Sequence, residues 1–337
     1  MQYKTLGRTG LTVSRLGFGG IPIQRINQEE TNSIFAVCRE LGINFIDTAR
    51  GYTDSEKKIG KAIAGNREQF YLASKSSRRD ALGLRADLET CLSLLKIEYV
   101  DLYQLHMVST MEVWDQVQGP GGAMEELLKA QQEGLIRFIG VTSHNNEVMQ
   151  HMIEASVFDT AQFPLNVVES QFVGCLNSAT GRNMGTIAMK PLAGGSFAKP
   201  SLALRYLFDK DITTAIVGMD SVAQVRENYA ALLQGSLSAE ESAELKVEAR
   251  TLGSDFCRRC EYCLPCPQDV RIPQVFILEG YVSRYGLIDW ARERYWSLPA
   301  QSDACEECGL CEDRCPYKLQ IRDKLKKAHA KFEAAGR

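Results

Sequence analysis

The sequence predicts a parallel (β/α)8 barrel followed by a small, mainly helical domain. Along the first 235 residues, short β-rich runs alternate with helical patterns at a fairly even pitch. Eight of the eleven cysteines then lie between Cys257 and Cys315. Eight strands, each followed by a helix, make a barrel of about 250 residues. Because single cores stop growing near about 250–300 residues, the cysteine-rich end is expected to form a separate part.

The strands are expected where the apolar runs are nearly continuous, such as NFIDTA and FIGVTS, because both faces of a parallel sheet are buried. They are Arg15–Gly20, Asn44–Ala49, Phe70–Lys75, Val100–His106, Phe138–Ser143, Thr160–Asn166, Thr186–Ala193 and Thr213–Met219. The segment Tyr3–Val13 precedes them and contains the turn GRTG. It is expected to form a hairpin that closes the bottom of the barrel.

Amphipathic helices are expected between the strands, at Asn32–Leu41, Glu56–Ala64, Ala86–Ile97, Met124–Glu133 and Ser201–Lys210. Glycines stand just past the last periodic residue of three of them, where a helix commonly ends. A doubly wound parallel sheet is the alternative fold. We favour the barrel, since no G-x-G-x-x-G motif follows a strand.

The C-terminal cysteines form two runs with the spacing of iron–sulfur ligands. The first run holds Cys257, Cys260, Cys263 and Cys266, and the second holds Cys305, Cys308, Cys311 and Cys315; a proline follows each. Three thiolates at two-residue spacing can hold one corner of a cluster, and the fourth cysteine then reaches the other cluster. Zinc and a disulfide framework are the alternatives, but zinc ribbons use pairs of cysteines and nothing marks the chain as secreted.

We therefore predict two [4Fe–4S] clusters with crossed ligands. Cys257, Cys260, Cys263 and Cys315 would hold one cluster, and Cys305, Cys308, Cys311 and Cys266 would hold the other. The barrel would span residues 1–237, a linking helix 238–253, and a ferredoxin-like iron–sulfur domain 254–337. In that domain the spacer between the runs reads as helical, and Lys324–Ala335 reads as a solvated terminal helix.

Charge and hydropathy limit the partners. The net charge of −3 provides no basic field for nucleic acid and no polybasic membrane anchor. The N-terminus MQYKTLGRTG has no apolar signal region, and no run approaches the roughly 18 apolar residues of a membrane helix. We therefore expect a protein that binds neither nucleic acid nor a membrane. We expect it in the cytoplasm, because that compartment keeps thiols reduced and available as ligands.

Four polar residues follow or end successive strands, on the rim where barrels of this kind carry their chemistry. They are Asp47, Tyr52, Lys75 and His106. A tyrosine titrates near about 10, so as a general acid it needs a neighbouring cation to stabilise its phenolate. A carboxylate can hold that cation in place, and a histidine can orient a carbonyl oxygen. Each residue alone has an ordinary structural reading, but the four together indicate a proton-transfer site.

The chain also resembles the aldo-keto reductases. The likeness spans roughly residues 3–230 and rests on GRTGLTVSRLGFGG, FIDTARGYTDSEKKIGKAI, YLASK, VDLYQLH and VGMDSVAQVREN. It implies a catalytic tetrad of Asp47, Tyr52, Lys75 and His106, with Tyr52 as proton donor to a substrate carbonyl. It also implies a nicotinamide dinucleotide cofactor, usually NADPH. The cysteine-rich end resembles the ferredoxin-fused branch of that family.

The same resemblance implies a set of cofactor contacts. Ser143, His144 and Gln162 would hold the carboxamide, the loop with Lys190, Pro191, Leu192 and Gly194 would lie along the pyrophosphate, and Gly218, Ser221, Gln224, Glu227 and Asn228 would bind the adenosine end. Two positions depart from the family pattern. Met189 stands where many members have an aromatic residue, and Gly218 and Gln224 stand where many have a lysine and an arginine. The residues therefore do not select NADPH over NADH.

Substrate and electron partners are less strongly encoded. We expect a small-molecule carbonyl substrate, with the long loop Met107–Gly122 and its Trp114 as a pocket wall or lid. Nicotinamide transfers two electrons as a hydride, whereas each cluster changes by one electron. An electron-transfer protein partner is therefore compatible with the sequence. The alternative function is an electron-transfer or redox-sensing protein whose barrel binds nicotinamide without carbonyl turnover.

Overall fold

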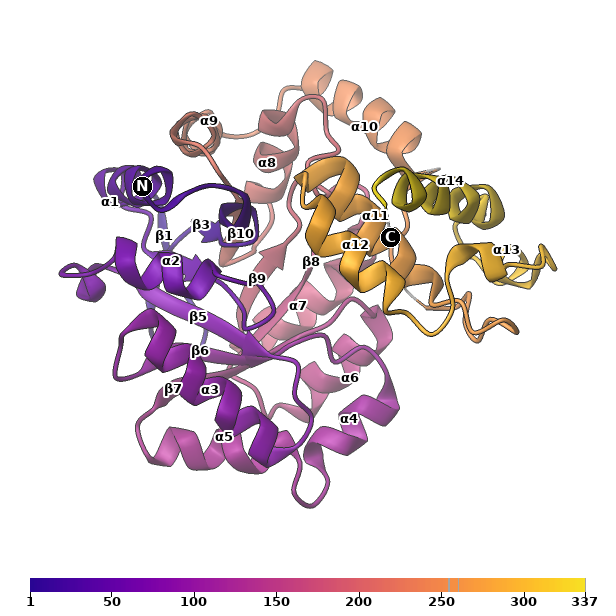
Figure 1. Cartoon of the computed structure of the whole chain (residues 1–337). Coiled ribbons are helices and arrows are strands. Elements are labelled where there is room, and N and C mark those ends of the chain that lie inside the picture. The colour runs from indigo at the N-terminus through magenta and orange to yellow at the C-terminus, as the bar shows by residue number, and fades with distance from the viewer. Residues whose placement is uncertain (254, 260, 337) are drawn as a thin grey trace. The chain divides into compact units, whose positions relative to one another are not determined.

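Eight parallel strands close into a barrel in the computed structural model of the chain, which describes residues 1–253, 255–259 and 261–336 (Figure 1). Around the barrel the strands follow the order β10-β3-β4-β5-β6-β7-β8-β9. Their bounds are β3 Leu16–Gly19, β4 Phe45–Asp47, β5 Tyr71–Ser76, β6 Val100–Leu105, β7 Ile136–Thr142, β8 Thr160–Pro164, β9 Gly185–Met189 and β10 Thr214–Gly218. Each falls within or beside an expected strand, so the predicted (β/α)8 barrel is confirmed.

The register of the strands brings polar residues to one rim. Asp47 ends β4 opposite Ala73 of β5, and Lys75 of β5 lies opposite Gln104 of β6. Because all eight strands run in parallel, their C-terminal ends share this rim.

A hairpin precedes the barrel, as predicted. Strands β1, Tyr3–Thr5, and β2, Thr12–Ser14, pair antiparallel. The turn between them passes so close to β9 that a Cβ at Gly7 would lie 2.3 Å from the amide nitrogen of Gly185. The Gly7 φ of 51° is also in the left-handed region, so only glycine suits this position.

The helices of the barrel alternate with the strands. They are α1 Gln28–Leu41, α2 Ser55–Ala62, α3 Ala81–Leu95, α4 Met111–Gln118, α5 Ala123–Gln132, α6 Asn146–Ala155, α7 Val173–Gly181, α8 Pro200–Phe208 and α9 Val222–Leu233, with short 3-10 turns η1 Pro22–Arg25, η2 Arg67–Gln69 and η3 Ser170–Phe172. All five predicted helices begin earlier than predicted, α1 by four residues and α3 by five. Asn27 and Glu30 form a capping box ahead of α1, and Asp80 caps α3 by accepting from the Gly83 amide.

The expectation for the segment Met107–Gly122 is wrong in one respect. It contains helix α4, and Trp114 on that helix is buried against Phe158 and the ring of His151. Trp114 therefore belongs to the barrel core and not to a pocket wall. Its contacts come from residues more than 35 positions away in the sequence, which no local pattern reports.

Helices α2 and α3 approach closely at Gly60. A Cβ there would lie 2.6 Å from the backbone oxygens of Leu94 and Leu95, whereas a Cβ at Gly174 of α7 would meet no atom within 4 Å. We expect Gly60→Ala to lower the free energy of unfolding by about 1–3 kcal/mol, because backbone cannot yield. Gly174→Ala should be neutral or stabilise by up to about 1 kcal/mol, since alanine favours a helix. Denaturant unfolding of the whole chain measures both, and equal midpoints would contradict the close approach.

The chain divides into two compact units. The first comprises Met1–Ala193 and Ala198–Ala243, and the second comprises Gly194–Phe197 and Glu244–Arg337. Helix α10, Ala239–Gly253, contributes to both and lies where the linking helix is expected.

The second unit is mainly helical, as predicted. It contains α11 Ile272–Tyr285, α12 Ile288–Trp296, η4 Ser302–Ala304, α13 Leu310–Asp313 and α14 Ile321–Ala334. The expectation that the last helix is simply solvated is wrong. It starts three residues earlier and buries Ile321, Leu325, Ala328 and Phe332 in the core of this unit, with Phe332 stacked on Tyr295 at 4.0 Å.

Candidate active site and cluster-binding domain

A buried ion pair lies at the rim of the barrel. The Lys75 ammonium donates to Asp47 Oδ1 at 2.5 Å and to the Thr48 carbonyl at 2.7 Å. Gln104 Nε2 donates to the other carboxylate oxygen at 3.3 Å. Burial lowers the pKa of Lys75 and raises that of Asp47, and the attraction between the two charges opposes both shifts. These bonds thus fix the Lys75 ammonium nitrogen at a defined, buried point of the rim.

Tyr52 and His106 complete the group that the sequence predicted. Lys75 Nζ lies 5.3 Å from the centroid of the Tyr52 ring, and the Tyr52 and His106 rings lie 6.0 Å apart at 83°. Residues from two strand ends and two loops therefore meet at one place.

The environment of His106 favours its neutral form. Burial first, and then the charges of Lys75, Arg79 and Lys190, hold the pKa of His106 well below its ordinary value. Its Nδ1 lies 3.5 Å from the Ser77 hydroxyl. At neutral pH the imidazole can orient a carbonyl without adding charge.

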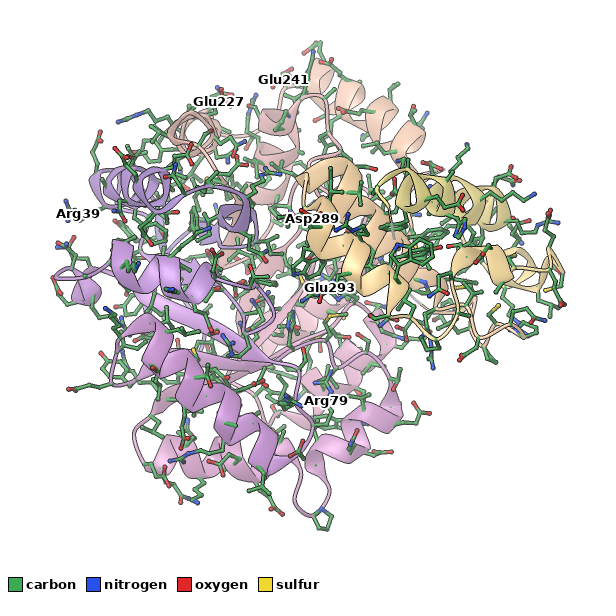
Figure 2. All side chains as sticks on the ribbon, viewed as in Figure 1. Arg39, Arg79, Glu227, Glu241, Asp289 and Glu293 are labelled. Carbon is green, nitrogen blue, oxygen red and sulfur yellow. The ribbon has the colours of Figure 1, made fainter. Side chains whose placement is uncertain are left out.

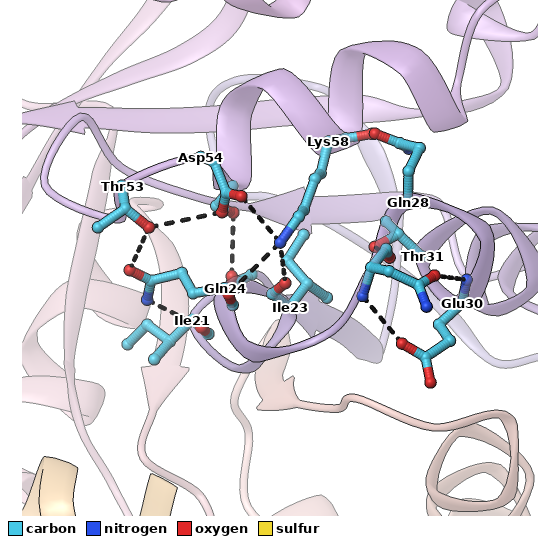
Figure 3. Close-up of polar contacts among 12 residues, drawn as sticks. Ile21, Ile23, Gln24, Gln28, Glu30, Thr31, Thr53, Asp54 and Lys58 are labelled. Carbon is cyan, nitrogen blue, oxygen red and sulfur yellow. Dashed lines mark hydrogen bonds and ion pairs between the residues drawn. The ribbon is translucent and has the colours of Figure 1, made fainter. Parts of the chain in front are cut away.

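The loop that carries Tyr52 is fastened to η1 and α2 (Figure 3). Thr53, whose φ of 35° is unusual for a residue with a side chain, donates through Oγ1 to Gln24 Oε1 at 2.9 Å. Lys58 of α2 pairs with Asp54 at 2.9 Å and donates to the Ile23 carbonyl at the same distance. These bonds restrict the position of the Tyr52 backbone, which a general acid requires.

The cysteine runs meet around a cavity in the second unit. This cavity is lined by the four cysteines assigned to one predicted cluster, namely Cys266, Cys305, Cys308 and Cys311, and Cys263 also reaches it. Cys315 is not among its lining residues. Among the residues that the structure describes, no three His, Cys, Asp or Glu side chains converge closely enough for a single metal ion. The thiols therefore surround a common space without converging on one point. This arrangement suits the several metal atoms of a cluster better than a single zinc ion.

Two contacts place the ends of the runs side by side. The Arg258 guanidinium lies 3.9 Å from the centroid of the Tyr317 ring, so the start of the first run adjoins the end of the second. Arg314 Nη1 donates to the Pro265 carbonyl at 3.0 Å. The predicted ligand Cys260 lies outside the described residues.

The fold agrees with the comparisons to known proteins. The profile of the aldo/keto reductase family matches residues 15–201, more than half of the chain. The chain belongs to the aldo/keto reductase family. The profile of the 4Fe-4S dicluster domain matches residues 256–320. The protein is thus an aldo-keto reductase with a C-terminal 4Fe-4S domain, as the sequence predicted.

Relatives share the barrel over most of their length. L-galactose dehydrogenase of Arabidopsis thaliana is 30% identical over 302 residues, covering 74% of this chain and 94% of the relative. A Pseudomonas aeruginosa protein assigned to the aldo-keto reductases is 27% identical with a TM-score of 0.63, covering 69% of this chain and 95% of its own. An aldo-keto reductase of Klebsiella pneumoniae, solved with NADPH, matches the fold at 22% identity and a TM-score of 0.63, covering 80% and 99%.

The carboxamide residues expected of an aldo-keto reductase lie on neighbouring strands. Gln162 of β8 is 2% exposed, and its Oε1 has no hydrogen-bond partner among the described residues. Ser143 and His144, which follow β7, are also buried. The Ser143 hydroxyl donates to the Asn145 carbonyl at 3.2 Å and accepts from the Asn145 amide at 3.1 Å, so it stabilises the turn into α6.

The segment after β9 is a chain of left-handed turns. Lys190, Ala193 and Gly194 have φ values of 54°, 47° and 72°. Pro191 is buried and Leu192 is half-buried, while the Lys190 carbonyl accepts from Asn166 Nδ2 at 3.0 Å. Gly194 already belongs to the second compact unit. Such turns leave backbone amides able to face an anion.

The residues expected at the adenosine end surround the start of α9. Ser221 caps this helix, accepting from the Gln224 amide at 3.2 Å, and Gln224 Oε1 accepts from the Asp220 amide at 2.9 Å. A Cβ at Gly218 would lie 2.8 Å from the Pro22 ring, so the chain passes close there. Asn228 is buried, whereas Glu227 is exposed on α9 (Figure 2).

Two arginines near this end of the barrel form ion pairs. Arg226 pairs with Glu40 of α1 at 3.0 Å. Arg25 of η1 forms an ion pair with Asp220, beside the cap of α9. The one signal in the sequence for Arg25 is its place in the loop that follows a barrel strand. Among the described residues, no helix combines the length and apolar character that spanning a membrane requires.

Proposed function

We propose that this aldo-keto reductase reduces the carbonyl group of a small molecule with a nicotinamide cofactor. The observation that carries the proposal is the convergence of Asp47, Tyr52, Lys75 and His106 at the rim of the barrel. The buried Lys75 ammonium lies 5.3 Å from the centroid of the Tyr52 ring, which supports a role in stabilising a phenolate.

Each residue has a distinct part in the reaction. A nicotinamide dinucleotide, when bound, supplies the hydride for the carbonyl carbon. Tyr52 donates its phenolic proton to the carbonyl oxygen, and Lys75 stabilises the phenolate that remains. Asp47 keeps Lys75 charged and in place. Ser77 Oγ lies 3.5 Å from His106 Nδ1, and a hydroxyl that donated there would leave the imidazole proton on Nε2, where it would bind the carbonyl oxygen.

The barrel offers groups that fit a nicotinamide cofactor. The buried Gln162 Oε1, which has no hydrogen-bond partner in the described part of the chain, can accept from a carboxamide N–H; leaving such an atom unpaired costs about 1–3 kcal/mol. Ser143 and His144 follow β7, the strand next to the strand that carries Gln162. The left-handed turns from Lys190 to Gly194 would suit a pyrophosphate. The adenosine end would be bound by residues at and after the end of β10, namely Gly218, Ser221, Gln224, Glu227 and Asn228. We propose NADPH, which the Klebsiella relative binds.

For the C-terminal domain we propose two [4Fe–4S] clusters with the crossed ligands predicted from the sequence. The cavity lined by Cys266 and the three cysteines of the second run supports this assignment, as does the contact of Arg258 with Tyr317 near Cys315. The domain would span residues 254–337, after a barrel of residues 1–237 and a linking helix of residues 238–253. Thiols in such number also favour a reducing compartment, so we retain the cytoplasm as the predicted location.

The two cofactors differ in electron count, so the proposal includes a partner. A hydride carries two electrons, whereas each cluster changes by one. The clusters would therefore exchange electrons, one at a time, with an electron-transfer protein or with the substrate.

The test is anaerobic purification followed by two measurements. We expect about eight irons and eight acid-labile sulfides per chain, four for each cluster. We also expect consumption of reduced nicotinamide with a panel of aldehydes and ketones, measured with NADPH and with NADH. A colourless protein with zinc would refute the cluster assignment. Tight cofactor binding and cluster reduction without carbonyl turnover would instead identify an electron-transfer or redox-sensing protein.

A further inference from the structure

Arg79 lies in the loop between β5 and α3, four residues after Lys75, and is labelled in Figure 2. Its Nη2 donates to the carbonyl of His106 at 2.8 Å and to that of Met107 at 3.0 Å. Both carbonyls belong to the loop that follows β6. These two bonds orient the guanidinium, because the group is planar and cannot rotate one nitrogen without the others.

The remaining terminal nitrogen, Nη1, has no hydrogen-bond partner among the described residues, although it is buried. Within the part of the chain that the structure describes, no carboxylate pairs with Arg79. Burial alone acts on this guanidinium and lowers its pKa, and no acidic residue offsets that shift. Its neighbour Arg78 differs, since its side chain is 63% exposed and lies 3.9 Å from Asp87.

Arg79 as a whole is half-buried, but its buried Nη1 faces no counter-charge among the described residues, which is unusual because desolvating a cation is costly unless an anion compensates. Arg79 acts electrostatically on His106, whose environment we described above. An anion that paired with Nη1 would therefore lie close to the proposed reaction centre.

We propose that Arg79 binds a carboxylate on the substrate, so that the preferred substrates are aldehydes or ketones that also carry an acid group. This inference rests on the proposed carbonyl reduction and narrows its substrate class. The two N–H groups of Nη1 are donors of the kind that carboxylates accept, with a charge-assisted bond as the result. The same chemistry could serve a phosphate of the cofactor, so the experiment separates the two sources.

The test compares matched aldehydes in the intact protein. 4-Carboxybenzaldehyde is set against 4-methylbenzaldehyde, and succinic semialdehyde against butanal. We expect the native protein to prefer the acid of each pair. Arg79→Met should lower kcat/KM for the acids by about 10- to 100-fold and change it for the neutral aldehydes by less than about 3-fold. Arg79→Lys should keep part of the preference, since lysine keeps the charge but not the planar group.

Arg78→Met is the matched control, and it should leave the preference unchanged because that side chain is exposed. Equal losses for acid and neutral substrates in Arg79→Met would overturn the proposal and leave Arg79 as a support for the His106–Met107 backbone. A weaker dissociation constant for NADPH, with the substrate preference unchanged, would assign Arg79 to the cofactor.

A binding measurement separates this inference from the proposed function. Calorimetry of the protein saturated with NADPH should show binding of benzoate but not of benzamide, and Arg79→Met should abolish it. If the native protein reduces none of the four aldehydes, the proposed function fails. Benzoate binding that depends on Arg79 would then still support the anion site, and its absence would refute it.

Discussion

Replacing Tyr52 by phenylalanine should remove most carbonyl reduction. We expect kcat to fall by about 10²- to 10⁴-fold, the usual contribution of a positioned general acid. The dissociation constant of NADPH should change by less than about 3-fold, because the hydroxyl acts mainly in the transition state. Steady-state kinetics and cofactor titration measure the two quantities.

Tyr103→Phe is the matched control for this substitution. Tyr103 is fully buried on β6, and its hydroxyl has no hydrogen-bond partner within the described part of the chain. Removing that hydroxyl should leave turnover and folding intact, since it abolishes no bond. Unchanged carbonyl reduction in Tyr52→Phe would refute Tyr52 as the acid. Equal losses in both variants would mean that the loss in Tyr52→Phe is not specific to a catalytic hydroxyl.

Replacing Cys266 by alanine should damage the cluster held by the second cysteine run and largely spare the other. Cys266 lines the same cavity as Cys305, Cys308 and Cys311, so its removal takes away one of four thiolates there. We expect iron content to fall from about eight to about four per chain. Paramagnetic resonance of the reduced protein should show that one of two signals is lost.

Two further variants make this result specific. Cys263→Ala should affect the other cluster, although Cys263 also reaches the cavity. Cys38→Ala should alter neither, because Cys38 is a buried thiol of α1 in the barrel core. Loss of the same signal in Cys266→Ala and Cys263→Ala would mean that each run holds its own cluster.

Most of the barrel could be predicted from the sequence, because the patterns that mark its strands and helix ends are local. Apolar runs marked every strand to within a few residues, and Gly42, Gly65 and Gly134 have the positive φ values of helix ends. Helix starts were less well predicted. The caps at Asn27 and Asp80 lie outside the apolar period, so a search for periodicity begins the helix too late.

The candidate site was likewise only partly predictable from the sequence. Its four reacting residues could be predicted, because parallel strands bring their C-terminal ends to one rim whatever the details of packing. The geometry among them could not. The pairing of Lys75 with Asp47 follows from the register of β4, β5 and β6, and the position of Tyr52 from bonds between its loop and η1.

The sequence by itself determined the fold class and the reactive residues of this protein: a parallel barrel, four polar residues at one rim, and eight cysteines at cluster spacing. The tertiary structure alone decided which groups stay unpaired. Gln162 Oε1 and Arg79 Nη1 lack partners among the residues that the structure describes, and Trp114 belongs to the core, because each depends on residues far away in the chain. Periodicity and spacing describe neighbours along the chain, whereas desolvation and hydrogen bonding depend on neighbours in space.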